Sequence, residues 1–238
     1  MASFKRVLSI DIGGTGLKAA IIDLQGKLIS EYVRVPTPHP CPPALMVKTL
    51  ATLVAPLNRF DCIAIGFPGV VRGPRVLTAP HLGTELYAGF DLATRVSKAL
   101  GGKPARLVND ADMQGFAVAK GKGLEFVITL GTGFGSALFR DGELMPHMEI
   151  AHMPVRKDMT FDDYLGDKER KKVGTRHWNR RVAKMLPVLH TLLNYDRLYI
   201  GGGNAKRIAF KVPRNTHIVA NIAGIKGGAG LWRQPVWK

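Results

Sequence analysis

The sequence predicts an α/β protein built from two similar halves. Two glycine-rich turns lie far apart in the chain, each between two apolar runs: "SIDIGGTGLKAAIID" (9–23) and "FVITLGTGFGSALF" (126–139). In each half, β-rich runs come first and amphipathic runs follow, which is an order typical of α/β proteins. The repeated pattern of strand, glycine-threonine turn and strand indicates an internal duplication.

Apolar periodicity predicts the elements of both halves. Strands are expected at 6–11, 17–23, 27–35, 61–66, 105–109, 124–131, 135–140, 143–147, 197–201 and 216–220. Helices are expected at 42–56, 89–100, 110–120, 160–173, 175–194 and 204–210, with a short helix after Lys226.

Composition and charge favour a soluble globular protein with an anionic partner. Of 238 residues 46% are hydrophobic and 22% charged, and 34 Lys and Arg against 18 Asp and Glu give a net charge of +16. This excess of positive charge suits phosphate, polyphosphate, nucleic acid or a membrane surface. The two cysteines, Cys41 and Cys62, are too few for a disulfide scaffold. With no signal peptide or membrane span in the sequence, we expect a cytoplasmic protein.

The first glycine-rich turn has two readings. No helix follows the glycines, so neither a dinucleotide fingerprint nor a Walker loop fits, and the glycines are expected to join two strands. Such a turn can still bind phosphate, because glycine exposes successive backbone N–H groups. A plain hairpin turn without a ligand is the alternative. The second copy of the turn favours phosphate binding.

Several motifs in order along the chain resemble the ROK sugar kinases of the actin-like, sugar kinase and Hsp70 superfold. The chain is most similar to the compact polyphosphate glucokinase branch of that family. The resemblance implies two α/β lobes with a cleft between them. The lobes are expected at 1–108 and 109–220, with a C-terminal helix (about 221–238) returning to the first. The motifs are "DIGGTGLK" (11–18), "GFPGVV" (66–71), "NDAD" (109–112), "LGTGFGSAL" (130–138), "EIAH" (149–152) and "IGGGNAKR" (200–207).

The resemblance assigns the catalytic base to Asp110, which accepts the proton of a sugar hydroxyl, and a hydrogen bond to a neighbouring hydroxyl to Asn109. A carboxylate at a helix N-terminus stays ionised at neutral pH because the helix dipole favours the anion. Helix capping is the alternative role for both residues. Asp112 is interpreted as a charge of the first helical turn and not as a catalytic group.

The resemblance also implies that Glu149 and His152 bind sugar hydroxyls. Ala151 stands where the family usually has glycine, which leaves the local backbone open. Many members carry a cysteine-rich zinc motif after this histidine, whereas no cysteine follows Cys62 here. A structural Cys/His zinc site is therefore not expected.

The donor side of the expected site consists of the two turns and the region of Gly201 and Gly202. Asp11, at the end of the first strand, can hold Mg²⁺ through water, with a role as an Asx-turn residue as the alternative. Lys18 faces either the phosphates or solvent. Gly201 and Gly202 fit either an adenine face or a polyphosphate tail. The expected donor-binding residues are Asp11, Gly13, Gly14, Thr15, Gly16, Lys18, Gly131, Thr132, Gly133, Gly135, Gly201 and Gly202.

The segment "KERKKVGTRHWNRRVAK" (168–184) holds eight basic residues and one acidic residue. On a helix from Thr175, one face is apolar, whereas Arg176, Arg180 and Lys184 lie on the opposite face. Three interpretations of the basic face are open: a solvated surface, contact with a long phosphoryl donor, or nucleic-acid binding. Nucleic acid is the least favoured, because no reader domain precedes the first turn.

Taken with these observations, the resemblance implies a hexose kinase that transfers a phosphoryl group from polyphosphate, ATP or both to the 6-hydroxyl of glucose or a related hexose. The alternatives are a non-catalytic sugar or phosphate sensor on the same fold and a nucleic-acid-binding protein. No membrane partner is expected, and the resemblance implies a homodimer.

Overall fold

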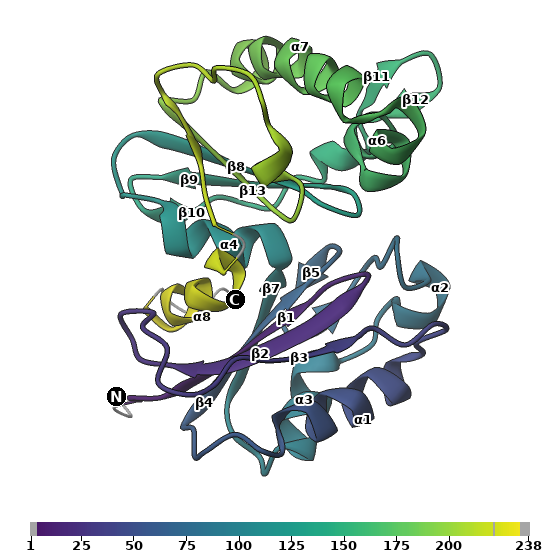
Figure 1. The fold of residues 1–238 in the computed structure, drawn as a ribbon. Coiled ribbons are helices and arrows are strands. Elements are labelled where there is room, and N and C mark those ends of the chain that lie inside the picture. The colour runs from purple at the N-terminus through teal and green to yellow at the C-terminus, as the bar shows by residue number, and fades with distance from the viewer. Residues whose placement is uncertain (1–3, 221, 234–238) are drawn as a thin grey trace. The chain divides into compact units, whose positions relative to one another are not determined.

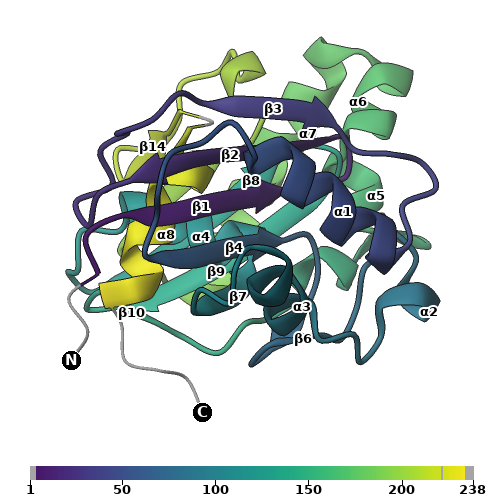
Figure 2. The same ribbon diagram turned by 90° about the horizontal axis from the view of Figure 1, so that it is seen from below.

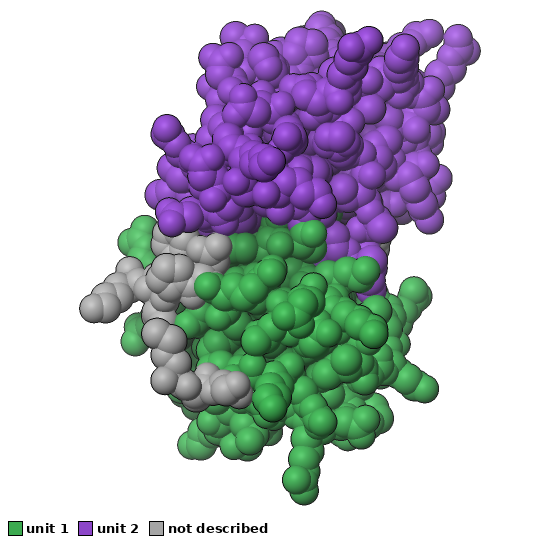
Figure 3. Space-filling model, turned by 90° about the vertical axis from the view of Figure 1, so that its left-hand side faces the viewer, with its two compact units in different colours: residues 1–117, 224–238 green, residues 118–223 purple. Residues whose placement is uncertain are grey.

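The structure is a computed structural model that describes residues 4–220 and 222–233. The chain forms two compact units, coloured separately in Figure 3. Unit 1 comprises residues 1–117 and 224–238, and unit 2 comprises residues 118–223. Within the described ranges, no helix has the length and apolar character needed to cross a membrane.

Unit 1 is built on a five-stranded sheet in the order β3-β2-β1-β4-β7. β1 pairs antiparallel with β2 and β2 with β3, whereas β4 and β7 run parallel to β1. Helices α1 and α3 lie on one side of the sheet, and α4 and α8 lie on the other (Figures 1 and 2). The bounds are β1 Val7–Ile12, β2 Gly16–Ile22, β3 Val33–Pro36, α1 Pro43–Val54, β4 Cys62–Phe67, β5 Val71–Arg72, β6 Arg75–Val76, α2 Thr84–Tyr87, α3 Leu92–Ala99, β7 Ala105–Asn109, α4 Asp110–Val118 and α8 Ala223–Arg233.

Successive side chains of β1 point to opposite faces of the sheet, so one face buries apolar side chains and the other a polar one. Leu8, Ile10 and Ile12 join the apolar core with α1 and α3. Ser9 faces α8, where its hydroxyl donates to the carbonyl of Ile225 (2.6 Å). Gly228 lies so close to the Ser9 hydroxyl that a Cβ would collide with it, so the glycines of α8 let this helix approach the sheet.

Unit 2 repeats the sheet of unit 1 with the order β10-β9-β8-β13-β14. Its first three strands are antiparallel and the last two run parallel to β8, as in unit 1. The duplication predicted from the two turns thus extends to whole sheets, and the α/β class is confirmed. The bounds are β8 Leu124–Leu130, β9 Phe134–Arg140, β10 Glu143–Leu144, β11 Pro154–Arg156, β12 Met159–Thr160, α5 Phe161–Leu165, α6 Asp167–Val173, α7 Thr175–Leu193, β13 Arg197–Gly201 and β14 Thr216–Ile218.

Helix α7 begins at Thr175, as the sequence predicts, and buries the expected apolar face. Trp178, Val182, Leu186 and Leu189 pack with the core residues of β8 and β13. The indole N–H of Trp178 donates to the carbonyl of Leu165 (2.7 Å), so this large buried side chain keeps its polar atom paired.

The strand expected at 27–35 is wrong over its first half. The turn after Asp23 is held by its own carboxylate, which accepts the N–H groups of Gln25 and Lys27. The Ser30 hydroxyl accepts the N–H of Ile21, a bond that a strand neighbour would otherwise make. These side chains compete with the backbone hydrogen bonds of a strand pair. Within the predicted range, only an isolated bridge between Ile22 and Leu28 and the strand β3 are therefore formed among the described residues.

The single helix expected at 160–173 is two helices, α5 and α6, separated by Gly166 in an extended conformation. A Cβ at Gly166 would lie 2.6 Å from the Asp162 carbonyl and 2.9 Å from that of Thr132. The N–H of Asp167 then donates to the glycine turn of β8 and β9 and not to the preceding helix. A tertiary hydrogen bond therefore breaks the helix.

Four further expectations need correction. The helix expected at 204–210 is a 3₁₀ turn, Ala205–Arg207. The Asn179 side-chain amide donates to the Arg207 carbonyl and accepts the Ala209 N–H, so these groups are not used in a helix. β10 ends at Leu144, and α3 begins only after its cap, Asp91. The C-terminal helix starts at Ala223, before Lys226. Part of the expected 221–238 segment, residues 221 and 234–238, lies outside the described residues.

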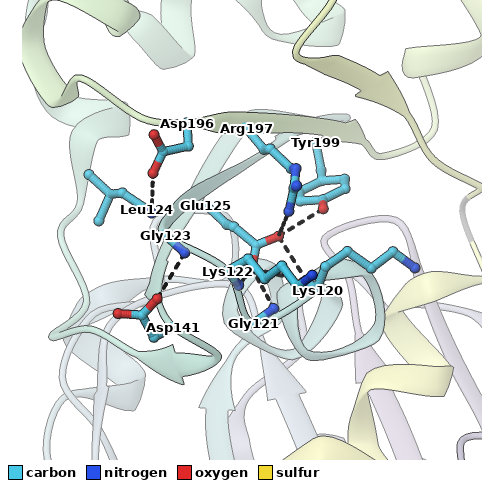
Figure 4. Close-up of polar contacts among 10 residues, drawn as sticks. All are labelled: Lys120, Gly121, Lys122, Gly123, Leu124, Glu125, Asp141, Asp196, Arg197 and Tyr199. Carbon is cyan, nitrogen blue, oxygen red and sulfur yellow. Dashed lines mark hydrogen bonds and ion pairs between the residues drawn. The ribbon is translucent and has the colours of Figure 1, made fainter.

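The connection from α4 to β8 is fixed by carboxylates of unit 2 (Figure 4). The fully buried Glu125 accepts three successive backbone N–H groups and the Tyr199 hydroxyl (2.8 Å). Burial alone would raise the pKa of Glu125, but these hydrogen bonds outweigh it and lower that pKa. The donors to Glu125 from this connection are the N–H groups of Lys120, Gly121 and Lys122, whereas Asp141 and Asp196 accept those of Gly123 and Leu124.

Candidate active site

The β1–β2 turn places its backbone in a defined orientation. Gly13 N–H donates to the Gly16 carbonyl (3.0 Å) and closes the turn. The Gly13 carbonyl accepts the Thr37 hydroxyl (2.7 Å), and the Gly14 carbonyl accepts His39 Nε2–H (2.9 Å). Among the hydrogen bonds of the described residues, none uses the N–H of Gly14 or Thr15 as donor. These two donors are therefore available to a ligand.

Asp11 and Lys18 form an ion pair beside this turn. They lie directly opposite on β1 and β2, and Lys18 Nζ is 2.9 Å from Asp11 Oδ2. Burial lowers the pKa of Lys18, but the charge and hydrogen bond of Asp11 outweigh it, so this pKa is raised. A Cβ on Gly224, at the start of α8, would lie 3.1 Å from Asp11 Oδ2. From the sequence, Lys18 could face either the phosphates or solvent; in the structure its ammonium group contacts Asp11.

A magnesium ion would find few protein ligands here. In the part of the chain that the structure describes, no group of three His, Cys, Asp or Glu residues could hold a metal ion. The Asp11 carboxylate keeps 13% of its side chain exposed. Because Mg²⁺ is commonly held by one or two carboxylates with water and substrate phosphates, this residue fits such an ion without a protein cage.

Asn109 and Asp110 lie where β7 ends and α4 begins. Asn109 is buried, and its amide donates to the Gly69 carbonyl (3.1 Å). The Ala111 N–H donates to Asn109 Oδ1 (2.8 Å) and Asp110 Oδ1 (2.9 Å), so both side chains also cap α4. The charge of Asp110 contributes to the raised pKa of Lys18. Unit 1 thus gathers Asp11, Lys18 and Asp110 at the carboxyl ends of β1 and β7, the edge where ligands of α/β sheets bind.

Gly66, in β4, packs close to the first turns of α4. A Cβ there would lie 2.7 Å from the flexible end of the Met113 side chain and at an ordinary contact distance, 3.4 Å, from the Asp110 Cα. The short distance to Asp110 shows that the end of β4 and the start of α4 are in contact.

The β8–β9 turn of unit 2 repeats the arrangement with different residues. Gly131 N–H donates to the Gly133 carbonyl (3.0 Å), while the carbonyls of Gly131 and Thr132 both accept the Asp167 N–H (3.1 Å each). Asn204 Nδ2 also donates to Gly131 (3.2 Å). Neither the Thr132 nor the Gly133 N–H donates to a described residue. Gly135, one residue into β9, pairs with Thr129.

Asp167 holds the residues around this second turn together. Its carboxylate accepts Arg170 and Lys171 (2.8 Å each) and the Asn204 amide (3.0 Å). Burial alone would raise the pKa of Asp167, but the hydrogen bonds from Lys171, Asn204 and Arg170 lower it to about 2. The carboxylate is therefore ionised in the folded protein at neutral pH.

Gly201 ends β13, and Gly202 follows it with a positive φ of 83°. A Cβ on Gly202 would lie 2.5 Å from the Leu130 carbonyl oxygen, so this position needs glycine to approach β8. Asn204 N–H then donates to that same carbonyl (2.8 Å). The "GGGN" segment therefore lies beside the second glycine turn.

Glu149 directly precedes a short 3₁₀ turn in unit 2, Ile150–His152, of which His152 is the last residue. The buried Oε2 of Glu149 has no hydrogen-bond partner among the described residues, which leaves an acceptor for a ligand hydroxyl. His147 Nε2 lies 3.7 Å from that oxygen, whereas the His152 side chain is exposed. His147 was not predicted from the sequence.

The sequence also did not predict the contacts to the two glycine turns made by Thr37, His39, Asp167 and Asn204. Thr37 and His39 belong to no glycine motif, and Asp167 reads as an ordinary charge in a helix. Only Asn204 gave a signal, because it follows directly on the three glycines at 201–203.

The two repeated sheets, each with a glycine turn between its first two strands, define an α/β protein of the actin-like ATPase fold. The family model for the ROK family matches residues 7–162. The chain belongs to the ROK family, as the motifs predicted.

Curated relatives and solved structures extend the match to nearly the whole chain. The polyphosphate glucokinase of Mycobacterium tuberculosis (strain ATCC 25618 / H37Rv) is 32% identical over 235 residues, covering 92% of this chain and 88% of the relative. The inorganic polyphosphate/ATP-glucomannokinase of Arthrobacter sp. strain KM has a TM-score of 0.85 at 30% identity, covering 94% of this chain and 97% of that one. A ROK family glucokinase from Streptomyces griseus, solved with glucose and AMPPNP, has a TM-score of 0.79 at 20% identity, covering 97% and 100%, and supports the fold alone.

Proposed function

We propose that this protein is a hexose kinase that transfers a phosphoryl group from polyphosphate or ATP to the 6-hydroxyl of glucose or a related hexose. The observation that carries the proposal is the pair of glycine turns. In each turn, neighbouring residues occupy the carbonyl groups, and two successive N–H groups have no acceptor among the described residues. Such N–H pairs bind phosphate oxygens. The polyphosphate- and ATP-dependent relatives support the same donor class.

In this proposal Asp110 accepts the proton of the sugar 6-hydroxyl. The hydroxyl oxygen then forms a bond to the terminal phosphorus of the donor, and the bond from that phosphorus to its bridging oxygen breaks. The donor leaves as ADP or as a polyphosphate shorter by one unit. Asn109, Glu149 and His152 orient the sugar, and Glu149 Oε2, which has no hydrogen-bond partner among the described residues, accepts a sugar hydroxyl.

The phosphates are bound by the two glycine turns and by Lys18. The donor residues of unit 2 include Gly201 and Gly202. Asp11 would hold Mg²⁺, which would supply neutralisation of the charge on the transferring phosphate. We further propose that the protein acts in the cytoplasm as a homodimer, in keeping with its expected soluble character and its family.

Helix α7 carries a basic face in the same unit as the second turn. Helix α6 begins at that turn, because Asp167 N–H is bonded to it, and α7 follows after Gly174. Arg176, Arg180 and Lys184 are exposed at successive turns of α7. In the described part of the chain none of the three has an acidic partner within ion-pair distance, in contrast to Arg181, which is bonded to Glu169 (2.9 Å). We infer that this basic face binds the distal phosphates of long donors.

The proposal is tested by incubating the purified protein with Mg²⁺ and glucose plus either ATP or polyphosphate, and measuring glucose 6-phosphate. We expect product with at least one donor and none without Mg²⁺. Sugar binding by calorimetry without any turnover would instead identify a sensor. Salt-sensitive binding to duplex DNA or RNA without a sugar response would identify a nucleic-acid-binding protein.

The role of Asp110 has a separate test. Asp110→Asn keeps one cap oxygen for Ala111 but removes the base, so turnover should fall by about 10³-fold while glucose affinity stays within about tenfold. Asp91→Asn, at the cap of α3 where the Thr94 N–H donates to Asp91 Oδ1 (3.0 Å), is the matched control. Turnover retained in Asp110→Asn would contradict the assignment of the base.

A further inference from the structure

The segment from Thr37 to His39, which follows β3, contacts the β1–β2 turn at three carbonyl groups. The Thr37 hydroxyl donates to Gly13 (2.7 Å), its N–H to Thr15 (3.4 Å), and His39 Nε2–H to Gly14 (2.9 Å). We propose that Thr37 and His39 are positioning residues that orient the turn for the phosphoryl donor. The proposal rests on the donor role of this turn given above.

The physical basis is the planarity of the peptide bond. In a trans peptide the carbonyl of one residue and the N–H of the next point in opposite directions. Fixing the carbonyls of Gly13 and Gly14 toward Thr37 and His39 therefore directs the N–H groups of Gly14 and Thr15 away from them. These are the two N–H groups that no described residue accepts.

The turn needs this support because of its composition. Gly13, Gly14 and Gly16 have wide backbone freedom, so the turn by itself has many accessible orientations. Such freedom would have to be lost each time a donor bound, which weakens binding. Bonds to three successive carbonyls remove it in advance.

The position of Thr37 is itself well defined. β3 pairs with β2 with Pro36 opposite Gly16, which places the next residue beside the turn. Thr37 is 5% exposed, and its hydroxyl has the Gly13 carbonyl as acceptor. The His39 side chain is exposed. Because a carbonyl only accepts, His39 must carry its proton on Nε2 in this contact.

The experiment compares Thr37→Val, which keeps the shape but loses the hydroxyl, with Thr37→Ser, which keeps the hydroxyl. Thr49→Val is the matched control, since the Thr49 hydroxyl donates to the Leu45 carbonyl (2.8 Å) within α1, away from the turn. Binding of tripolyphosphate by calorimetry is measured beside KM for donor, KM for glucose and kcat, with Tm for each variant.

We expect Thr37→Val to weaken tripolyphosphate binding and raise the donor KM by about tenfold, with glucose KM unchanged and Thr37→Ser close to wild type. His39→Ala should raise the donor KM by about threefold and His39→Gln less, because a glutamine amide can donate to the same carbonyl. Thr49→Val should leave donor binding unchanged.

Two results would overturn the inference: Thr37→Val binding tripolyphosphate as wild type does, or Thr49→Val weakening donor binding equally. The binding readout separates this inference from the kinase proposal. A wild-type protein without sugar turnover, whose tripolyphosphate binding is weakened by Thr37→Val but restored by Thr37→Ser, would remove the kinase function and support the positioning role.

Discussion

Lys18 lies directly opposite Asp11 across the β1–β2 pair, with its Nζ 2.9 Å from the Asp11 carboxylate. The contact is mostly shielded from solvent, with 25% of the Lys18 side chain and 13% of the Asp11 side chain exposed. The ion pair therefore sets the charge next to the first glycine turn. It also links stability to function, because a phosphate or Mg²⁺ bound there would compete for the same two groups.

Lys18→Met should lower the free energy of unfolding by about 1–3 kcal/mol, because it leaves the Asp11 carboxylate shielded without its cation. It should also raise the KM for both donors. Urea unfolding and donor kinetics provide the measurements. Lys27→Met, an exposed lysine in the turn after β2, should change stability by less than about 0.5 kcal/mol. Equal effects of the two substitutions would contradict the importance of the pair.

Glu125→Gln should lower the free energy of unfolding by about 2–4 kcal/mol, because an amide nitrogen would face the N–H groups that the buried carboxylate accepts. Chemical denaturation measures this loss. Glu143→Gln, an exposed residue of β10, is the control and should be nearly neutral. Hydrogen exchange at Lys120, Gly121 and Lys122 should accelerate in Glu125→Gln; unchanged protection would show that the connection is held by other contacts.

The stability contribution of Asp167 should depend on pH in the acid range. Its pKa is lowered in the folded protein to about 2, so its contribution is fully present above the unfolded pKa of about 3.9 and is lost as the pH falls towards 2. The stability difference between wild type and Asp167→Asn should therefore shrink between pH 5 and pH 2.5. Urea midpoints at several pH values measure it. A difference that stays constant over this range would argue against an ionised, hydrogen-bonded Asp167.

Replacing Arg176, Arg180 and Lys184 together by Gln should raise the KM for long-chain polyphosphate by about tenfold, since three surface charge contacts are lost at roughly 0.5 kcal/mol each. The KM for ATP should stay within about twofold. A charge-matched triple variant of Lys48, Arg95 and Lys98, all exposed on α1 and α3 of unit 1, should leave both values unchanged. Similar losses for polyphosphate in the two variants would indicate only a general effect of net charge.

The α/β class and the internal repeat could be predicted from the amino-acid pattern alone. Alternating and helical periodicity report which face of an element is buried, and this was enough to predict the apolar face of α7 and the paired strands around Gly13 and Gly131. The glycine turns and the motifs between Asp11 and Arg207 identified the family, because they are short local patterns that can be read without knowing which distant residues meet.

The hydrogen-bond partners of the backbone that lie far away in the chain are known only from the folded protein. The Thr37 hydroxyl and the Asp167 N–H both donate to carbonyl groups of glycine turns that are far from them in the chain. The bond from Asp167 divides the predicted helix 160–173 at Gly166. In the same way Glu125 accepts donors from its own connection and from Tyr199. Hydrophobic periodicity does not predict such pairings, because a polar residue gives the same sequence pattern whether its side chain is hydrated or hydrogen-bonded to a buried carbonyl.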